Sequence, residues 1–186
     1  FIIFFVKLKC EAMKYLLELQ KSERLNYRKL EKTDFDWWME FSTNPEATRY
    51  FDFSNNINPE DFCRLWFNKV FDRYKKNTGG HNVLVELEAE KPVGMCGLLI
   101  QEVDGVNELE IGYSLHPAFW GKGFATEAAR KCRDFAFTNS FTESLISIVH
   151  VDNISSANVA LKNGMNIDKT TVYKGIPVNI FRIRKP

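Results

Sequence analysis

The spacing of apolar residues predicts a strand and three helices in the first part of the chain. Residues 25–30 predict the strand, whereas residues 13–19 and 34–41 favour short helices. Pro59 occupies a favoured first helical position and begins a longer helix that we expect to extend to about Lys76. Apolar residues recur at helical spacing on one face of that helix: Phe62, Leu65, Trp66, Val70 and Tyr74.

The middle of the chain alternates apolar and polar residues and predicts three consecutive strands. We place these strands at residues 83–87, 93–101 and 108–115, with a turn at residues 90–92. The third strand has its apolar residues on one face: Leu109, Ile111, Tyr113 and Leu115. The opposite face of that strand carries the others: Glu108, Glu110, Gly112 and Ser114.

A glycine-containing loop at residues 120–124 separates these strands from a helix with a narrow stripe of small and apolar residues. The stripe consists of Ala125, Ala128, Ala129, Cys132, Phe135 and Ala136. Residues 145–151 predict another strand, residues 155–163 a short helix, and residues 170–183 a hairpin. This order of elements indicates an α/β (α+β) fold in which helices cover both faces of a sheet.

Length and composition favour one domain. The 186 residues, 45% of them hydrophobic, allow a sizeable core, and no internal repeat or long linker divides the chain. We therefore expect a single domain at residues 22–186, preceded by an extension or short helix at residues 1–21. The 25 basic and 24 acidic residues nearly balance, so a nucleic acid is not expected as a partner.

The cysteines and the apolar residues at the start of the chain indicate the cellular compartment in which we expect the protein. The four cysteines form neither a CxxC pair nor a Cys/His cluster: Cys10, Cys63, Cys96 and Cys132. We expect reduced thiols in a cytoplasmic protein and no metal site. The opening run FIIFFV has six residues, too few for an export signal or a membrane anchor, so no membrane partner is expected. Met13 offers a natural start, in which case residues 1–12 are an extension.

The segment LHPAFWGKGFATEA, residues 115–128, allows two interpretations. The first turn of a helix has unpaired N–H groups and a partial positive charge, which suit an anion such as a phosphate. Gly121 and Gly123 let the backbone approach a ligand closely, and Lys122 adds a charge. The pattern matches neither GxxxxGK[ST] nor GxGxxG, however, so taken alone it favours a plain turn.

Three segments in order change that interpretation. The stretch EIGYSLHPAFWGKGFATEA resembles the acetyl-CoA-binding motif of the GNAT N-acetyltransferase superfamily, whose loop reads Gln/Arg-x-x-Gly-x-Gly/Ala. SERLNYRKLEKTD resembles the opening strand of the RimJ/RimL-like branch, which acetylates ribosomal-protein N-termini and related amines. Asn153-Ile-Ser-Ser156 with Lys162-Asn-Gly164-Met165 resembles that branch's Asn-x-x-Ser and Lys-x-Gly-Phe segments. The resemblance covers roughly residues 22–184 and implies the GNAT fold, with a mixed, mostly antiparallel sheet.

The resemblance also implies acetyl-CoA as co-substrate and a set of residues that bind it. Backbone amides of residues 121–126 would hold the pyrophosphate, and the backbone of Leu115 would pair with the pantetheine arm. Asn153 and Ser156 would lie near the arm or the thioester. Trp120 departs from the usual Gln or Arg, which affects one side-chain contact but no amide contact. The implied coenzyme-binding residues are Leu115, Trp120, Gly121, Lys122, Gly123, Phe124, Ala125, Thr126, Asn153 and Ser156.

Candidates for the chemistry come from the strand before the loop and from the helix after it. Glu110 matches the family's recurrent Glu before Ile-Gly-Tyr, and we prefer it as general base or as binder of the acceptor's ammonium group. Alternatively, Glu108 and Glu110 are surface charges paired with Lys or Arg. His150 is a second base candidate, more simply a structural strand histidine.

The leaving-group acid is less defined. Many GNAT enzymes carry a Tyr seven residues after the Asn of the helix, where this chain has Ala160. The Ser of this branch, Ser156, either donates to the leaving thiolate or only caps the helix. Of the other histidines, His116 is expected to shape the entry to the loop, and His81 to lie exposed in a loop beside two glycines.

The acceptor is predicted only as a primary amine, on a protein N-terminus or a small molecule. Aromatic residues of the early helices either line its pocket or belong to the core: Trp37, Trp38, Tyr50, Phe51 and Phe53. We expect a monomer or homodimer. Two other interpretations stay open: a non-catalytic acyl-CoA-binding or regulatory module with the same fold, and an unrelated α/β protein in which GKG is only a turn.

Overall fold

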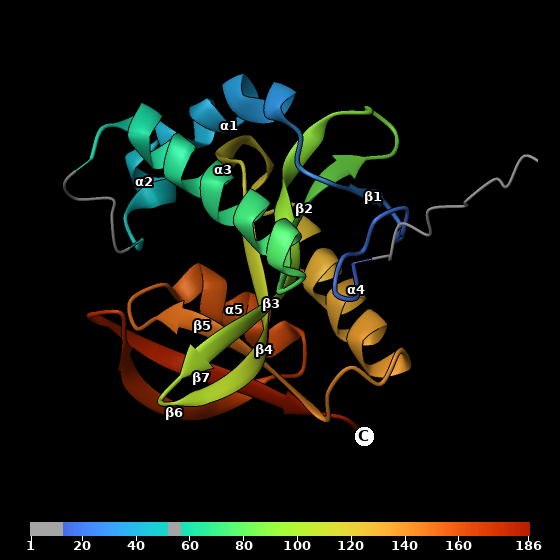
Figure 1. The fold of residues 1–186 in the computed structure, drawn as a ribbon, viewed down its shortest axis with the longest axis vertical. Helices are drawn as coiled ribbons and strands as arrows, with labels where there is room; N and C mark the ends of the chain where they lie inside the picture. Colours follow the sequence, from blue (N-terminus) through green and yellow to red (C-terminus); the bar gives the residue numbers. More distant parts are fainter. Residues whose placement is uncertain (1–12, 52–56) are drawn as a thin grey trace, which may run out of the picture.

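The computed structural model describes residues 13–51 and 57–186, which form one seven-stranded sheet with helices on both faces (Figure 1). The strand order is β1-β2-β3-β4-β5-β7-β6, and every neighbouring pair is antiparallel except β4 and β5. The strands are β1 (Leu25–Arg28), β2 (Gly79–Glu86), β3 (Pro92–Val103), β4 (Val106–Leu115), β5 (Ser144–His150), β6 (Asn166–Tyr173) and β7 (Ile176–Arg184). The helices are α1 (Phe35–Ser42), α2 (Pro45–Thr48), α3 (Pro59–Lys76), α4 (Phe124–Thr138) and α5 (Ile154–Lys162), with short 3-10 turns η1 (Lys32–Asp34) and η2 (Pro117–Phe119).

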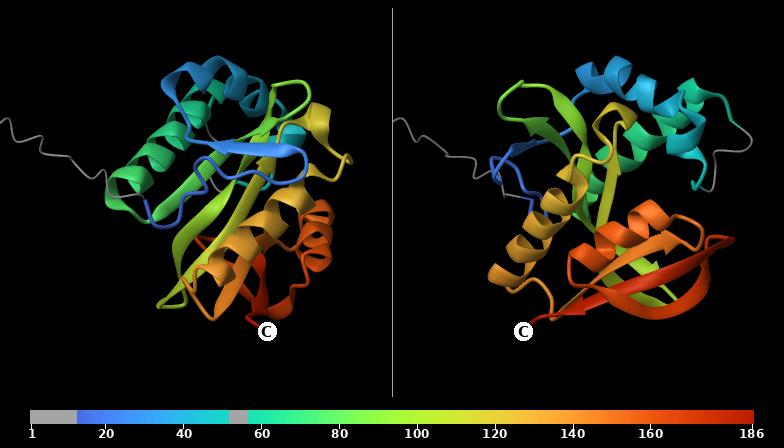
Figure 2. Two further views of the ribbon diagram at one scale, coloured as in Figure 1. Left: turned by 90° about the vertical axis from the view of Figure 1, so that its right-hand side faces the viewer. Right: turned by 180° about the vertical axis from the view of Figure 1, so that it is seen from behind.

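The parallel pair divides the sheet. β4 and β5 share a single registered pair, Glu110 with Ile146, and beyond it they diverge. Figures 1 and 2 show the β1–β2–β3 part of the sheet on one side of this division and the β5–β7–β6 part on the other. A mixed, mostly antiparallel sheet with helices on both faces was predicted, and it is confirmed. The single splayed parallel pair was not predicted.

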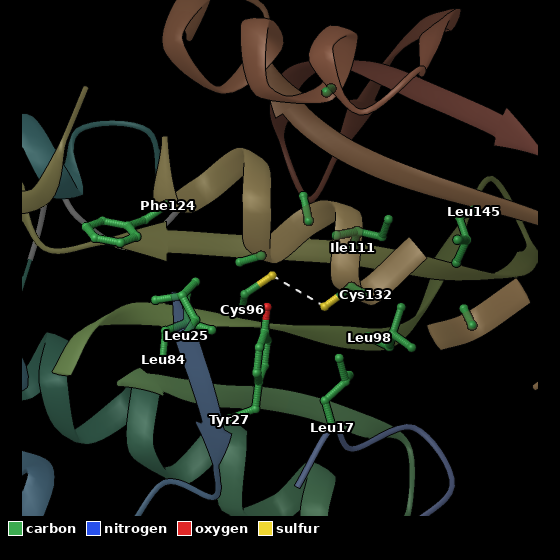
Figure 3. Close-up of a cluster of buried hydrophobic side chains, with 14 of the residues drawn as sticks. Leu17, Leu25, Tyr27, Leu84, Cys96, Leu98, Ile111, Phe124, Cys132 and Leu145 are labelled. Carbon is green, nitrogen blue, oxygen red and sulfur yellow. Dashed lines mark hydrogen bonds between the residues drawn. The ribbon is translucent and has the colours of Figure 1, made fainter. Parts of the chain in front are cut away.

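Two apolar clusters hold the helices to the sheet. α4 and α5 cover one face, where one apolar cluster extends from Phe124 to Leu98 and the thiols of Cys96 and Cys132 lie 3.5 Å apart (Figure 3). α1 and α3 cover the other face with an aromatic cluster over β2 and β3: Trp38, Phe41, Phe62, Trp66 and Phe67. β3 contributes side chains to both clusters, as expected for a central strand buried on both faces.

The segment before β1 differs from its prediction. Residues 13–19 form turns and not the expected short helix. Leu17 is fully buried in the main cluster, and backbone bonds join Leu19 and Gln20 to Tyr27. Tertiary packing of this turn-containing segment therefore overrides its helical spacing. The domain division at residue 22 stays a prediction.

Two details of α3 and β2 also differ. Leu65 is 41% exposed because the buried stripe of α3 runs through Cys63 and Phe67 instead. Gly79 and Gly80 begin β2 and do not form a loop. A Cβ atom on Gly79 would lie 1.9 Å from the Leu98 carbonyl oxygen, so here glycine permits close approach of two strands.

Cys63, Cys96 and Cys132 are free thiols, and Cys10 lies outside the described residues. Within the described part of the chain, each helix is too short or too polar to cross a bilayer.

Candidate active site

A cavity of about 1250 Å³ opens where β4 and β5 diverge. It extends from the start of α4, past the start of α5, to the C-terminal half of α3 and the β6–β7 hairpin. Its volume exceeds that of a typical single-ligand pocket, which is about 300–1,000 Å³. The cavity therefore has room for the reacting parts of two substrates.

The edge of β4 presents backbone groups to this cavity. His116 donates to the Val93 carbonyl of β3, and antiparallel pairs alternate, so Ile111, Tyr113 and Leu115 direct their N–H and C=O groups away from β3, toward β5. The Ser147 hydroxyl donates to the Ile111 carbonyl at 2.9 Å and closes the narrow end of the gap. The Tyr113 and Leu115 backbone lies beyond that closure, where the strands are apart.

The loop after β4 is both a turn and an amide cradle. Gly121 and Gly123 have φ angles of 73° and 84°, which L side chains rarely adopt. The first helical bond runs from the Glu127 N–H to the Gly123 carbonyl, so the N–H groups of residues 124–126 have no partner within the helix. A Cβ atom on Gly121 would meet no atom within 4 Å, so the surface beside this glycine is open.

A buttress behind the loop fixes its shape. The Arg24 guanidinium donates to the Lys122 carbonyl at 3.1 Å and to Glu127 at 2.7 Å. The Ser22 hydroxyl also donates to Glu127, at 2.7 Å, and the guanidinium lies 4.5 Å from the Phe124 ring centroid. These bonds lower the pKa of Glu127, against a burial effect that raises it, so the carboxylate stays ionised next to cationic Arg24.

Two loop side chains are placed differently from what an anion site suggests. The Lys122 ammonium lies 5.0 Å from the Phe119 ring centroid, and of residues 120–126 only Lys122 does not line the cavity. The indole N–H of Trp120 donates to the Leu115 carbonyl at 2.7 Å, and this side chain is 48% exposed. Trp120 thus occupies the backbone group that the pantetheine arm was expected to pair with.

The start of α5 shows which residue caps the helix, a role that the sequence left open for Ser156 beside that of proton donor. Asn153 is the N-cap, and its side chain accepts from the Ser156 N–H at 3.0 Å. α5 therefore begins at Ile154, one residue before the predicted start, and the capping interpretation of Ser156 is wrong. The Ser156 hydroxyl donates to the Tyr113 hydroxyl at 3.2 Å, and the Tyr113 hydroxyl donates to the Ser156 carbonyl at 2.8 Å.

Tyr113 was predicted on the apolar face of its strand, but its polar tip bridges β4 and α5 at the cavity wall. Burial is the main cause that raises the pKa of this phenol, and the Ser156 hydrogen bond opposes it. The phenol therefore stays protonated at neutral pH. Ala160, where a tyrosine was considered, is buried.

Glu110 lines the cavity and accepts from the Gln101 side-chain amide at 2.7 Å. Burial raises the pKa of this carboxyl, and the Gln101 bond and the nearby Arg73 charge only partly oppose it. A Cβ atom added to Gly112 would lie 2.8 Å from a Leu99 methyl carbon, 3.1 Å from His81 Nε2 and 3.9 Å from the Glu110 carboxyl carbon. The cavity wall at Gly112 is therefore crowded by Leu99 and His81, with the Glu110 carboxyl group beside them.

Glu108 behaves as the alternative interpretation described. It forms two hydrogen bonds with Arg182, at 2.7 and 3.1 Å, and Arg182 also pairs with Asp168 at 3.0 Å. These carboxylates raise the pKa of Arg182. The two glutamates of one strand face thus lie in different surroundings: Glu108 in an ion pair, Glu110 on the cavity wall.

Two of the three histidines, His81 and His150, line the cavity, and the position of His81 differs from its prediction. His81 belongs to β2 and lines the cavity, so its predicted exposure in a loop is wrong. Burial, with a smaller contribution from the Arg73 charge, lowers the pKa of His81 to about 3. His150 also lines the cavity, and its ring lies 4.9 Å from that of Tyr50. The His116 Nε2 atom lies 3.2 Å from Glu40 at the entry to the loop.

The early aromatic residues serve both expected purposes. Trp38 is fully buried in the core, and Trp37 packs against it. Tyr50 and Phe51 line the cavity. Phe53 lies outside the described residues.

Several residues that complete the site carry no local sequence signal. Arg24, Gln101 and Arg73 come from three separate segments, and only the fold brings them to the loop or to Glu110. Tyr113 is the exception, because a tyrosine on an otherwise aliphatic strand face needs a partner for its hydroxyl.

Known proteins resemble this chain in sequence and in fold. A family model described as an acetyltransferase (GNAT) domain matches residues 24–166. The N-acetyltransferase p20 of Bacillus licheniformis is 30% identical over 157 residues, covering 82% of this chain and 84% of the relative. The spermidine N(1)-acetyltransferase of Escherichia coli (strain K12) is 25% identical over 157 residues, covering 84% and 80%.

Solved structures share the fold at lower identity. An acetyltransferase from Agrobacterium tumefaciens superposes with a TM-score of 0.76 at 23% identity, covering 89% of this chain and 94% of the other. RimL, a ribosomal L7/L12 alpha-N-protein acetyltransferase solved with coenzyme A, superposes with a TM-score of 0.72 at 15% identity, covering 89% and 97%.

Proposed function

This chain belongs to the GNAT acetyltransferase family and is an N-acetyltransferase of the RimJ/RimL type, and we propose that it transfers an acetyl group from acetyl-CoA directly to a primary amine. The amine nitrogen bonds to the acetyl carbonyl carbon as the carbon–sulfur bond breaks. The amine loses one proton, and the thiolate gains one. The relatives' names support an amine as acceptor, since they include a spermidine and a ribosomal-protein acetyltransferase.

The amide cradle at residues 121–126 is the proposed site of the coenzyme pyrophosphate. Three N–H groups without helical partners, two glycines in a left-handed conformation and an open surface beside Gly121 support it. The Arg24 buttress holds the Lys122 carbonyl on the far side, which directs the amides toward the cavity. Lys122 itself adds only long-range charge.

The proposed path of the pantetheine arm follows the edge of β4. Tyr113 and Leu115 direct backbone groups into the gap, where an extended amide-bearing chain can bind as a strand would. The Leu115 carbonyl becomes available once the Trp120 indole turns away. Asn153 and Ser156 lie on the opposite wall, at the start of α5.

Glu110 is the proposed base. A carboxyl group with a raised pKa takes the ammonium proton more readily than an ordinary carboxylate, directly or through a water molecule. His81 also lines the cavity, but an imidazole with a pKa of about 3 is too weak a base to compete. The amine is therefore placed in the cavity beside the Glu110 carboxyl group.

Ser156 is the proposed proton donor to the leaving thiolate, with Tyr113 as its positioning residue. The Tyr113 hydroxyl accepts from Ser156 and donates to the Ser156 carbonyl, which fixes the serine side chain at the cavity wall. The phenol keeps its own proton throughout, and the proton that Glu110 has taken from the amine returns through solvent water to the serine oxygen. This pair fills the role that Ala160 leaves vacant.

The observation that carries the proposal is the splayed β4–β5 pair, with an amide cradle at its open end and Glu110 at its closed end. Thermal unfolding with acetyl-CoA, coenzyme A and ATP tests the cradle, and we expect stabilisation by the first two only. Thiol release over a panel of amines tests the chemistry. Stabilisation without thiol release for any amine would favour the non-catalytic module, and no stabilisation by either coenzyme form would exclude both interpretations.

A further inference from the structure

Arg73 on α3 differs from the other half-buried arginines. Of the five in the described part of the chain, four have a carboxylate oxygen within 3.0 Å: Arg24, Arg28, Arg133 and Arg182. The guanidinium of Arg73 binds only neutral oxygens: Thr78 O at 3.3 Å, Ile100 O at 3.0 Å and Gln101 Oε1 at 2.8 Å.

This guanidinium has unused capacity and faces the cavity. Arginine has five N–H donors, and the bonds made within the described residues use three of them. Burial lowers the pKa of Arg73, and the nearby Glu110 charge only partly opposes that effect. A half-buried cation in this condition gains most from an anion that enters with a ligand.

One amide group joins Arg73 to the proposed base. Gln101 accepts from Arg73 and from the Tyr173 hydroxyl, and its amide nitrogen donates to Glu110 at 2.7 Å. These partners fix the orientation of the Gln101 amide. The cation and the carboxylate therefore stand side by side on the cavity wall, a few bond lengths apart.

Arg73 lies too far from the loop to serve the coenzyme pyrophosphate. Its partner Gln101 pairs with Glu108, whereas Gly94 pairs with Leu115 beside the loop. Seven residues separate Gln101 from Gly94 on β3, which is about 23 Å at roughly 3.3 Å per residue. An anion that binds Arg73 therefore belongs to the amine acceptor and not to the coenzyme.

The charge of this end of the cavity is also positive. Among the described residues, α3, β4 and the β6–β7 hairpin contribute four cations and two carboxylates to the wall: Lys69, Arg73, Lys76, Lys174, Asp72 and Glu110. A polyamine with several positive charges would meet repulsion here, whereas an acceptor with a negative group would not.

We propose that the acceptor is an amine that carries an anionic group a few bonds from its nitrogen, with Glu110 facing the amine and Arg73 binding the anion. This inference rests on the proposed function and specifies its substrate class. A free amino acid and a peptide N-terminus that begins with an acidic residue share this chemistry.

Matched acceptor pairs test the proposal by thiol release. L-phenylalanine is compared with L-phenylalaninamide, the peptide Asp-Ala-amide with Asn-Ala-amide, and spermidine serves as the polycation. We expect the anionic member of at least one pair to have a kcat/KM about tenfold or more above its neutral partner, since hydrogen bonds between charged groups are the strong class. The pair that shows the preference identifies the source of the anion.

Variants then assign the preference to Arg73. Arg73→Gln should lower kcat/KM for the anionic acceptor about tenfold, mainly through KM, and change that of its neutral partner less than about threefold. Arg73→Lys should recover part of the loss. Lys75→Gln removes a charge from an exposed position of the same helix and should leave both values unchanged.

Several results would overturn the inference. A wild-type preference for spermidine or for the neutral members would exclude an anionic acceptor. Equal losses for both members in Arg73→Gln, with no recovery in Arg73→Lys, would give Arg73 a structural role only. Acetyl-CoA binding without acetylation of any amine would overturn the proposed function, and this inference with it.

Discussion

The two ends of the cavity are built in different ways. The proposed coenzyme end is lined by consecutive residues of the loop at 120–126, except Lys122, and Arg24 supports that loop from behind. The acceptor end consists of single side chains from α3, β2, β3 and β4: Arg73, His81, Gln101 and Glu110. One end depends on a local conformation and the other on the tertiary fold.

This difference decides what a substitution can change. At the coenzyme end, Trp120 departs from the usual residue without altering the amides, because every residue type carries the same backbone. At the acceptor end, the Gln101 hydrogen bond and the Arg73 charge both act on the pKa of Glu110. We therefore expect side-chain substitutions at the acceptor end to affect turnover or acceptor binding, and substitutions that change the loop backbone to affect coenzyme affinity.

The largest expected effect is that of Glu110→Gln. Removing the base should lower kcat by about 10²-fold or more, since general bases contribute about 10²–10⁴-fold, while the Kd of acetyl-CoA stays unchanged. Thiol release and calorimetric titration measure the two quantities. Glu108→Gln is the matched control, because Glu108 lies on the same strand face but is held by Arg182. An unchanged kcat in Glu110→Gln would remove Glu110 from the mechanism.

Glu110 also gives turnover and stability opposite pH dependences. Because its folded pKa is raised, protonation at lower pH removes the base, and kcat should fall as pH falls through that pKa. The same shift means that the folded chain holds its proton more tightly than the unfolded chain. The contribution of Glu110 to stability is therefore present at low pH and is lost as pH rises. A Glu110→Gln variant should lose the acid limb of the rate profile.

His81 provides the second largest expected effect, on stability. The unfolded chain takes up a proton near pH 6.5, whereas folded His81 resists protonation down to about pH 3. Between pH 6.5 and 5 the wild type should thus lose about 1.6 kcal/mol of unfolding free energy to this group. Urea unfolding at the two pH values measures the loss, and His81→Gln should reduce it. Equal losses in both proteins would show that His81 accepts its proton in the fold.

Two glycines in the same backbone conformation allow the effect of the loop on coenzyme affinity to be separated from its effect on stability. Gly121 and Gly105 have φ angles of 73° and 79°, and a Cβ on either meets no atom within 4 Å. Each change to Ala should therefore cost stability by a similar amount, about 1 kcal/mol. Only Gly121→Ala should raise the Kd of acetyl-CoA, by about tenfold, because its Cβ and altered φ disturb the amides. Equal affinities in the two variants would make the loop a turn only.

The same contrast explains how far the sequence predicted this molecule. The loop and α3 have local signals of caps and glycines, and their bounds follow closely, whereas β2 and β6 each begin four residues before the predicted start. Residues 13–19 show the limit, because Leu17 is drawn into the core against its helical pattern. Glu110 was found through a motif, whereas Arg73 and Gln101 have no local signal and become neighbours only when α3 packs beside β3.

Substitution of Trp120 has the smallest expected effect on coenzyme affinity, and it concerns a side chain that binds a backbone group of the coenzyme end. Its indole N–H holds the Leu115 carbonyl, a backbone group on the proposed path of the pantetheine arm. If the arm pairs with that carbonyl, coenzyme binding must first break the bond. Trp120→Phe removes the N–H, keeps an aromatic ring and should lower the Kd of acetyl-CoA about two- to threefold, since one net hydrogen bond is worth about 0.5–1.5 kcal/mol. Calorimetric titration measures it. A higher Kd in the variant would instead mean that the indole hydrogen bond stabilises the loop conformation that binds acetyl-CoA. In that case a side chain, and not only the backbone amides, would contribute to coenzyme affinity.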